Sequence, residues 1–210
     1  MADDKKYLRK ILKESRTALS KVRADALSAL VEQRLLGSSY YLEAGDVVLY
    51  APADNEIHTS RILGDTLRSG RRVMMPKVVP DSHELSLVVV NDPAELRPGA
   101  YGLLEPTGAE IVLPARLRRA LICVPGVAFS PIGQRLGRGG GFYDRLLAAV
   151  GPQTVTAGLA YEFQVLDRLP ESPHDRRLDL IVTESAVHVA GDAPRLAASR
   201  TDQGGVFRCR

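Results

Sequence analysis

The first part of the chain carries apolar side chains at helical spacing. Residues 5–19 place five side chains on one stripe, with Asp3 or Asp4 as a candidate cap: Leu8, Ile11, Leu12, Ser15 and Leu19. Ser20 is positioned to cap a second helix and Gly37 to end it. The apolar face of this second helix is expected to comprise Val22, Ala26, Leu27, Leu30, Val31 and Leu35. The pattern therefore predicts an amino-terminal pair of amphipathic helices.

After this pair, short apolar runs alternate with helical segments. Strands are expected at residues 46–51, 72–78, 85–90, 120–124, 154–160 and 178–183, with an edge strand at 186–190. Helices are expected at 59–68, where Gly70 follows, and at 142–150. Unbroken apolar strands separated by helices, such as Leu-Ser-Leu-Val-Val-Val at 85–90, are typical of parallel sheets covered on both faces. We therefore expect an α/β fold of three α/β/α layers around a mainly parallel sheet.

One domain is expected over residues 1–190, because no linker or internal repeat divides them. With 210 residues, of which 45% are hydrophobic and 25% charged, the chain can bury one substantial core. Residues 191–210 mix Gly, Asp, Ser and Arg with little periodicity, and they are expected to form a flexible tail.

Charge and composition argue against several classes of protein. A net charge of +3 argues against a dedicated nucleic-acid binder. No apolar run approaches a membrane span and the amino terminus is not a signal peptide, so we expect a cytoplasmic protein. Cys123, in a predicted core strand, and Cys209, in the tail, form neither a disulfide framework nor a metal pattern. Cys123 is expected to be a small buried hydrophobe.

The chemistry is concentrated in a glycine-rich loop between the strand at 120–124 and the helix at 142–150. The loop holds Gly126, Gly133, Gly137, Gly139, Gly140 and Gly141. Such a loop can turn backbone N–H groups toward one anion, above all a phosphate, and the start of the following helix adds to that field. Arg135, Arg138 and Arg145 supply forked donors, and Asp144 is placed to hold Mg²⁺. A flexible linker is the alternative, but linkers are rich in Ser and lack structured flanks.

The loop matches neither of the two commonest phosphate-binding motifs. No Gly-Lys-Ser/Thr follows the glycines, and Phe142 stands where a dinucleotide fingerprint has its third glycine. The residues alone therefore predict an anion site without naming the ligand. Because ligands of parallel sheets lie beyond the carboxyl ends of the strands, this loop and the one at 52–56 are expected to form one site.

The glycine-rich loop and five further segments, in the expected order, make the chain similar to a known family. Residues 125–129 (PGVAF) and 133–144 (GQRLGRGGGFYD) resemble the signature of the 5-formyltetrahydrofolate cyclo-ligase family. Further resemblance lies at 5–9 (KKYLR), 50–57 (YAPADNEI), 101–106 (YGLLEP), 158–164 (GLAYEFQ) and 174–179 (HDRRLD). It extends from about residue 5 to about residue 190. It implies a fold like that of sugar-phosphate isomerases and CoA transferases.

The resemblance implies a ligase that uses ATP and Mg²⁺ to convert 5-formyltetrahydrofolate, with or without a polyglutamate tail, to 5,10-methenyltetrahydrofolate, ADP and phosphate. The γ-phosphoryl group would go to the formyl oxygen, and N10 would then attack the formyl carbon. This chemistry needs positioning and charge neutralisation more than a tuned acid or base. The protein is expected to act as a monomer, without nucleic acid or membrane.

The resemblance also implies roles for individual residues. ATP would be bound by Lys5, Lys6, Arg9, Arg135, Leu136, Gly137, Arg138, Gly139, Gly140, Gly141, Phe142 and Tyr143. The folate would contact Ala51, Glu56, Arg138, Gly139, Gly140, Gly141 and Phe142, with Glu56 on the pterin. Arg138 would be the catalytic residue, and Asp144, with Asp179 as a second contributor, would hold Mg²⁺.

Each of these roles has a structural alternative. Lys5, Lys6 and Arg9 suit a solvated helix end, which the sequence without the family favours. Glu56 suits a solvated loop, and Phe142 and Tyr143 suit a core. Asp144 is also favoured by the helix dipole, and Asp179 can pair with Arg176 or Arg177.

The chain departs from the family pattern at two positions. Gly140 stands where many relatives have Lys, and His58 where an acidic residue is expected.

A sugar-phosphate isomerase or CoA transferase would keep the fold but would not need the Mg²⁺-capable loop. An RNA-binding protein would use the basic residues at 5–16 and 116–119, but only 5% of residues are aromatic and few bases could stack.

Overall fold

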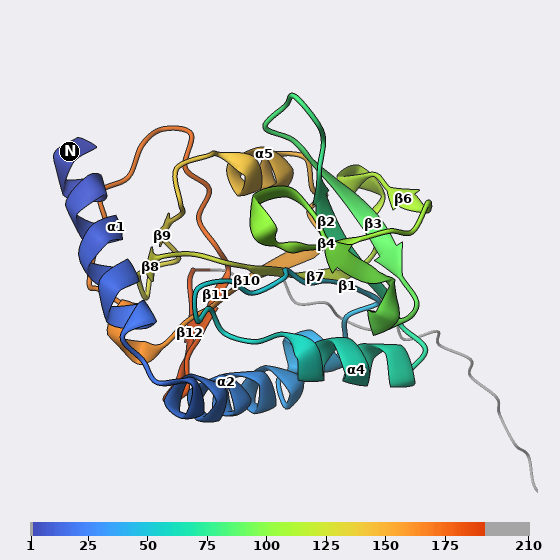
Figure 1. Ribbon diagram of the computed structural model, residues 1–210, viewed down its shortest axis with the longest axis horizontal. Coiled ribbons are helices and arrows are strands. Elements are labelled where there is room, and N and C mark those ends of the chain that lie inside the picture. Colours follow the sequence, from blue (N-terminus) through green and yellow to red (C-terminus); the bar gives the residue numbers. More distant parts are fainter. Residues whose placement is uncertain (1, 192–210) are drawn as a thin grey trace, which may run out of the picture.

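The computed structural model describes residues 2–191 (Figure 1). The predicted tail, apart from Gly191, and Cys209 lie outside the described residues. The helices are α1 (Ala2–Thr17), α2 (Lys21–Leu36), α3 (Ser39–Leu42), α4 (Ser60–Arg68) and α5 (Phe142–Ala148). The strands are β1 (Asp46–Val48), β2 (Arg72–Val78), β3 (Leu85–Val90), β4 (Leu96–Pro98), β5 (Leu104–Pro106), β6 (Ile111–Val112), β7 (Ala120–Val124), β8 (Ala128–Phe129), β9 (Arg135–Leu136), β10 (Thr154–Leu159), β11 (Leu180–Val182) and β12 (Val187–Val189).

An eight-stranded mixed sheet organises the fold, in the order β12-β11-β10-β7-β1-β2-β3-β6. Its five central strands, β11 to β2, are parallel to one another, which confirms the predicted mainly parallel sheet. β12 is the predicted edge strand and is antiparallel. β3 is also antiparallel, although its apolar run was taken to indicate a parallel strand. The connection from β2 to β3 is a short turn, and a parallel pairing needs a long crossover.

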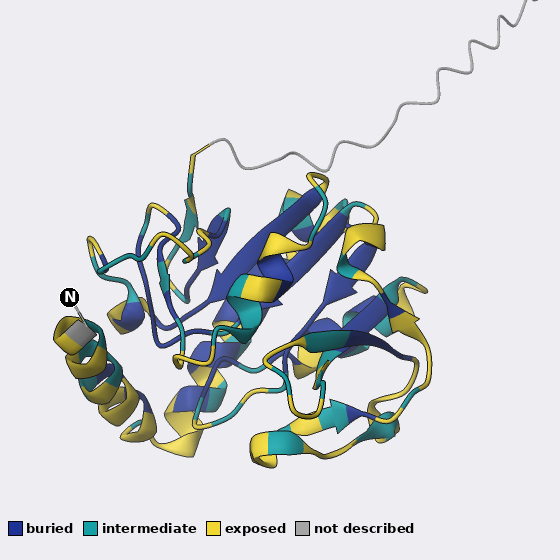
Figure 2. Ribbon diagram, turned by 90° about the horizontal axis from the view of Figure 1, so that it is seen from above, coloured by how far each residue is buried: buried dark blue, intermediate teal, exposed yellow. Residues whose placement is uncertain are grey.

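Helices cover both faces of the sheet, so the three-layer architecture is confirmed (Figure 1). On one face, α2 and α4 pack through Leu27, Val31 and Ile62 onto one set of strand side chains. On the other face, α5 packs through Leu146 and Leu147 onto the alternate set. β7 serves both layers: Cys123 is fully buried in the first, as predicted, and Ile122 is buried in the second. Figure 2 shows the buried central strands.

The amino-terminal helices form as predicted, with Ser20 accepting a hydrogen bond from the Arg23 backbone and Gly37 ending α2. Their buried faces differ from the predicted ones. In α2 the buried residues are Ala24, Leu27, Ser28, Val31, Glu32 and Leu35, whereas the predicted Val22, Ala26 and Leu30 are exposed. Packing against the sheet buries the face of α2 that begins at Ala24. Ser28 and Glu32 can lie on this face because their side chains accept hydrogen bonds from backbone N–H groups in the chain after β1.

α1 lies at one end of the sheet rather than on either face (Figure 1). Leu12 packs with Val127, Ala128, Leu136 and Leu169, which belong to the small β8–β9 ribbon and the chain beside it. Ser15 of the predicted stripe is exposed, and Arg16 is buried in its place. This end of the sheet therefore brings a helix, a ribbon and the loops after the parallel strands together. Among the described residues, no helix is long and apolar enough to cross a membrane.

Candidate functional site

A cavity of about 940 Å³ opens where β1, β2 and β7 end. Residues 50–56 and the glycine-rich loop both line it, so the two loops share one cavity. Its other walls are α1, the β4–β5 ribbon, the start of α5 and residues 172–176. Six Lys and Arg residues and four Asp and Glu residues line the cavity. Its volume is at the upper end of the range of small-molecule sites, roughly 300–1,000 Å³, and its lining suits a large anionic ligand.

A buried carboxylate, Glu56, marks one end of the cavity. Its Oε1 accepts a hydrogen bond from Arg138 Nη2 at 2.9 Å, and its Oε2 accepts one from the Ala53 backbone at 3.1 Å. Arg138 also lies 3.6 Å from Asp54 Oδ2. The alternative that Glu56 is a solvated loop residue is therefore wrong, because this side chain is almost completely buried. The pairing links the loop after β1 to the glycine-rich loop.

Arg16 reaches the same carboxylate from α1. Its Nη1 lies 3.5 Å from Glu56 Oε1 and donates to the Gly126 carbonyl at 3.2 Å, and its Nε donates to the Asp54 carbonyl at 2.9 Å. Burial lowers the pKa of Arg16, and the charge of Glu56 opposes that shift. A guanidinium remains protonated in proteins, so two positive charges face one buried carboxylate.

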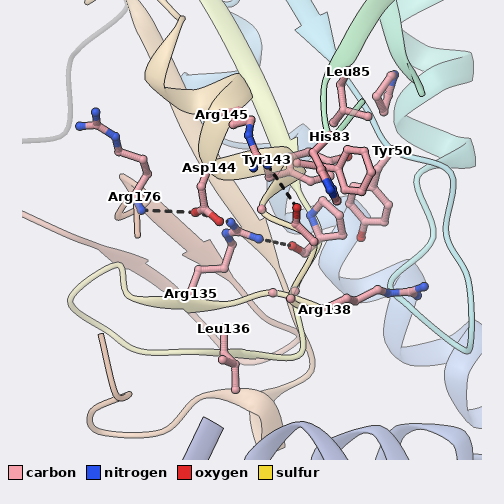
Figure 3. A pocket seen from close by; sticks show the side chains of 18 of the residues that line it. Tyr50, His83, Leu85, Arg135, Leu136, Arg138, Tyr143, Asp144, Arg145 and Arg176 are labelled. Carbon is pink, nitrogen blue, oxygen red and sulfur yellow. Dashed lines mark hydrogen bonds and ion pairs between the residues drawn. The ribbon is translucent and has the colours of Figure 1, made fainter. Parts of the chain in front are cut away.

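The opposite end of the cavity holds a second arginine–carboxylate pair (Figure 3). Arg135 Nη2 donates to Asp144 Oδ1 at 2.8 Å, and the Arg176 backbone N–H donates to the same oxygen at 3.4 Å. Arg135 is buried, its guanidinium lies 5.9 Å from the Tyr143 ring centroid, and its buried Nε has no hydrogen-bond partner. A buried donor without a partner is costly, which favours a ligand group that accepts from it.

The amino-terminal helix contributes two of the three predicted cations. Lys5 Nζ donates to Asp175 Oδ2 at 2.6 Å and to Ser172 Oγ at 2.8 Å, while Arg9 Nε donates to the Gly137 carbonyl at 2.8 Å. Both line the cavity. Lys6 is exposed and does not line it, because it lies about 100° around the helix from Lys5. Of the three cations, only Lys6 therefore fits the alternative of a solvated helix end.

Aromatic side chains form part of the cavity wall. The Phe142 ring centroid lies 5.5 Å from that of His83 and 6.2 Å from that of Tyr101. Tyr143 and Tyr50 line the same wall. Burial, and then the charge of Glu56, raises the pKa of both tyrosine hydroxyls above the ordinary range. At neutral pH these hydroxyls are therefore uncharged.

The glycines shape the loop between the ends. Gly139 and Gly141 adopt φ values of 104° and 70°, which residues with side chains rarely adopt. At Gly140 a Cβ would lie 2.8 Å from the Phe142 ring, so the ring occupies the space that a side chain would need. Leu136, Gly137 and Ala51 also line the cavity, as the sequence predicted.

Asp179 does not lie with these residues. Its Oδ2 accepts hydrogen bonds from the Thr156 backbone at 2.8 Å and from Thr156 Oγ1 at 2.7 Å, across the β10–β11 pair. It precedes β11, at the end of the sheet away from the cavity, and it is not a lining residue. Among the described residues Asp179 does not pair with Arg177, the alternative partner, because Arg177 pairs with Glu171 instead. Within residues 2–191, no cluster of three or more His, Cys, Asp or Glu could hold a metal.

Sequence reasoning missed Arg16, Tyr50, His83 and Arg176 as parts of the site. A signal for Arg16 was present, because residues 5, 9, 12 and 16 share one helical face, and two of them were already site candidates. Tyr50 adjoins the predicted Ala51. His83 comes from the turn after β2, and Arg176 comes from a loop far along the chain, so only the folded chain brings them here.

Comparison with known proteins agrees with the geometry. The model of the 5-formyltetrahydrofolate cyclo-ligase family matches residues 1–184. The 5-formyltetrahydrofolate cyclo-ligase of Escherichia coli (strain K12) is 31% identical over 180 residues, covering 84% of this chain and 98% of that relative. The relative of the same name from Mus musculus is 27% identical over 191 residues, covering 87% and 94%. The NMR structure of Aquifex aeolicus 5,10-methenyltetrahydrofolate synthetase superposes with a TM-score of 0.79 and 36% identity, covering 94% and 98%.

Proposed function

The chain belongs to the 5-formyltetrahydrofolate cyclo-ligase family and is a ligase that forms 5,10-methenyltetrahydrofolate from 5-formyltetrahydrofolate; we propose that the cavity of about 940 Å³ holds the folate at the Glu56 end and ATP at the Asp144 end. One observation carries this assignment. The glycine-rich loop supplies Arg138 to the buried Glu56 and Arg135 to Asp144, so one loop spans both ends.

At the folate end, Glu56 supports binding of the pterin. A carboxylate can accept two N–H bonds from an aminopyrimidinone edge, and burial of Glu56 strengthens those bonds. The Ala51 backbone, Tyr50 and Phe142 line the surrounding wall. An aromatic wall is suited to the rings of the folate.

At the phosphate end, the cations support binding of the ATP phosphates. Lys5 and Arg9 approach from α1, while Arg135 and Arg138 approach from the glycine-rich loop. The guanidinium of Arg135, which holds Asp144, would donate to phosphate oxygens once that carboxylate turns toward Mg²⁺. Guanidinium groups match phosphate oxygens in a forked geometry. Lys6, which does not line the cavity, is not part of this proposed site.

The residues around Asp144 fit Mg²⁺ that arrives with the nucleotide. Mg²⁺ is commonly held by one or two carboxylates together with substrate phosphates and water, and Asp144 is such a single carboxylate at the cavity wall. Bound there, Mg²⁺ would neutralise charge on the phosphates. Asp179, which holds Thr156 instead, is not part of the proposed set.

The proposed reaction follows from the chemistry of the formyl group. The formyl oxygen on N5 is a poor leaving group until the γ-phosphoryl group of ATP is transferred to it. N10 then attacks the formyl carbon and loses its proton, and phosphate departs with the former formyl oxygen. Arg138, which pairs with Glu56 and has a half-exposed side chain, would turn toward the phosphates and stabilise charge on the transferring phosphoryl group. The uncharged Tyr50 and Tyr143 would help to exclude water from this step.

The experiment that tests this function follows the absorbance of the methenyl product. Protein, 5-formyltetrahydrofolate and Mg²⁺ are mixed with and without ATP. Growth of the methenyl band only with ATP is the expected result. No growth from a folded protein that binds Mg·ATP would contradict it.

We propose further that the enzyme is a cytoplasmic monomer. The mass of the purified protein by light scattering tests the second part, and a dimer mass would contradict it.

A further inference from the structure

Arg16 is buried in the wall behind the proposed folate end. Its side chain is 1% exposed, and it joins three parts of that wall. It donates to the Asp54 carbonyl in the loop after β1 and to the Gly126 carbonyl in the loop after β7. Its Nη1 lies 3.5 Å from Glu56 Oε1. The function proposed above assigns no role to this residue.

Arg16 and Arg138 share one oxygen of Glu56 but differ in how freely they can leave it. The Arg138 side chain is 46% exposed on the glycine-rich loop, whereas Arg16 is enclosed and tied to two backbone carbonyls. A pterin that pairs with Glu56 needs the carboxylate oxygens as acceptors. Arg138 can turn into the cavity, but Arg16 cannot leave without breaking both of its backbone bonds.

The local charges decide what happens when Arg138 turns away. Glu56 and Asp54 are the acidic groups, and Arg16, Arg138 and the more distant Lys13, which lies 3.3 Å from Asp54, are the basic ones. A buried carboxylate with no cation beside it is unfavourable and tends to become neutral. Once Arg138 is engaged by phosphate, Arg16 is the cation that remains against Glu56.

We propose that Arg16 is a positioning residue for folate recognition. It stays on Glu56 while substrate displaces Arg138, and it keeps that carboxylate paired and oriented toward the N–H groups of the pterin. This inference rests on the proposed role of Glu56. The two arginines therefore have different roles. Arg16 positions Glu56 for folate binding, and Arg138 stabilises charge on the transferring phosphoryl group.

The test separates the charge of Arg16 from its bracing of the two loops. Arg16→Lys keeps a cation, whereas Arg16→Gln keeps an amide donor without the charge. Lys13→Met is the matched control, because it removes a cation from the same helix that contacts Asp54 but not Glu56. The dissociation constant of 5-formyltetrahydrofolate without ATP is measured by calorimetry, beside kcat and the KM for ATP.

Arg16→Gln is expected to weaken folate binding by about tenfold to a hundredfold, the scale of a lost charge-assisted contact. Arg16→Lys is expected to remain within about fivefold of the wild type, and Lys13→Met within about twofold. The KM for ATP is expected to change little in all three. An equal loss in Arg16→Gln and Arg16→Lys, or a parallel rise in the KM for ATP, would overturn the proposal. Wild-type affinity in Arg16→Gln would overturn it as well.

A second comparison covers a variant that fails to fold. Glu56→Gln and the double variant Arg16→Gln/Glu56→Gln are expected to bind folate equally, because Arg16 acts through Glu56. A further loss in the double variant would contradict this. The wild-type methenyl assay keeps the two proposals apart. If the wild type does not turn over, the proposed function fails, and if it turns over while Arg16→Gln binds folate normally, only the role of Arg16 fails.

Discussion

The two ends of the cavity hold the same kind of ion pair with opposite burial. At the folate end, the Glu56 carboxylate is 6% exposed and its partner Arg138 is 46% exposed. At the phosphate end, Arg135 is 4% exposed and its partner Asp144 is 28% exposed. The two pairs have nearly the same length, 2.9 and 2.8 Å. Distance therefore does not distinguish them, but burial does.

The opposite burial indicates which member of each pair a substrate can displace. The exposed member can turn toward solvent or a ligand at low cost, whereas the buried member would leave an unpaired charge in the protein interior. The folate end thus keeps a carboxylate for N–H donors and releases an arginine. The phosphate end keeps an arginine for phosphate oxygens and can release a carboxylate to Mg²⁺. Variants of the four residues and their neighbours test this comparison.

The largest effect is expected from Arg138→Ala. Loss of the displaceable arginine should lower kcat by about a thousandfold, the scale of a removed phosphoryl-stabilising arginine. Folate affinity should not fall, because Arg138 competes with the pterin for Glu56 and its loss removes that competition. Steady-state kinetics in both substrates measures the two effects. A change confined to the KM for folate would place Arg138 on the folate instead.

Asp144→Asn should have the next largest effect. Removing the charge of the displaceable carboxylate should lower kcat by about a hundredfold and raise the Mg²⁺ concentration needed for half-maximal activity. Titration of activity with Mg²⁺ measures both. Asp179→Asn is the control: it should lower the melting temperature by weakening the bonds to Thr156 and leave the Mg²⁺ dependence unchanged. Near-normal turnover of Asp144→Asn at saturating Mg²⁺ would remove Asp144 from the metal site.

Lys5→Met should raise the KM for ATP by about tenfold, since an ammonium group at the phosphate end would be lost. Lys6→Met is the matched variant, because Lys6 is the exposed neighbour that does not line the cavity. It should leave that KM unchanged. Initial rates at varied ATP provide the measurement, and equal effects of the two variants would show that only the net charge of α1 matters.

The smallest effect is expected from Gly140→Lys, which adds a cation to the glycine-rich loop at the cavity wall. A solvent-exposed cation should lower the KM for ATP by about two- to fivefold. The Phe142 ring must first move, because it lies 2.8 Å from the position of the new Cβ. Gly140→Ala requires the same movement of the Phe142 ring but adds no charge. A gain in both variants would attribute the effect to the ring and not to the charge.

The sequence by itself predicted the layers, most of the strands and the loop that carries the chemistry. Apolar runs at 120–124 and 154–160 could be recognised because both faces of a central parallel strand are buried. The glycine-rich loop could be recognised because Gly139 and Gly141 adopt backbone conformations that few other residues tolerate. These features depend on local conformation and local burial, which a short segment of sequence specifies.

The tertiary structure alone decided which residues meet, and how deeply each is buried. Arg16 can lie on the buried face of α1 because two backbone carbonyls and Glu56, all far along the chain, pair with its guanidinium. Asp179 was expected at the metal, yet its position before β11 directs its carboxylate across the sheet to Thr156. The antiparallel pairing of β3 and the opposite burial of the two ion pairs also depend on distant segments. A charged side chain can be buried only where such segments supply its partners, so its place in the site is a property of the assembled fold.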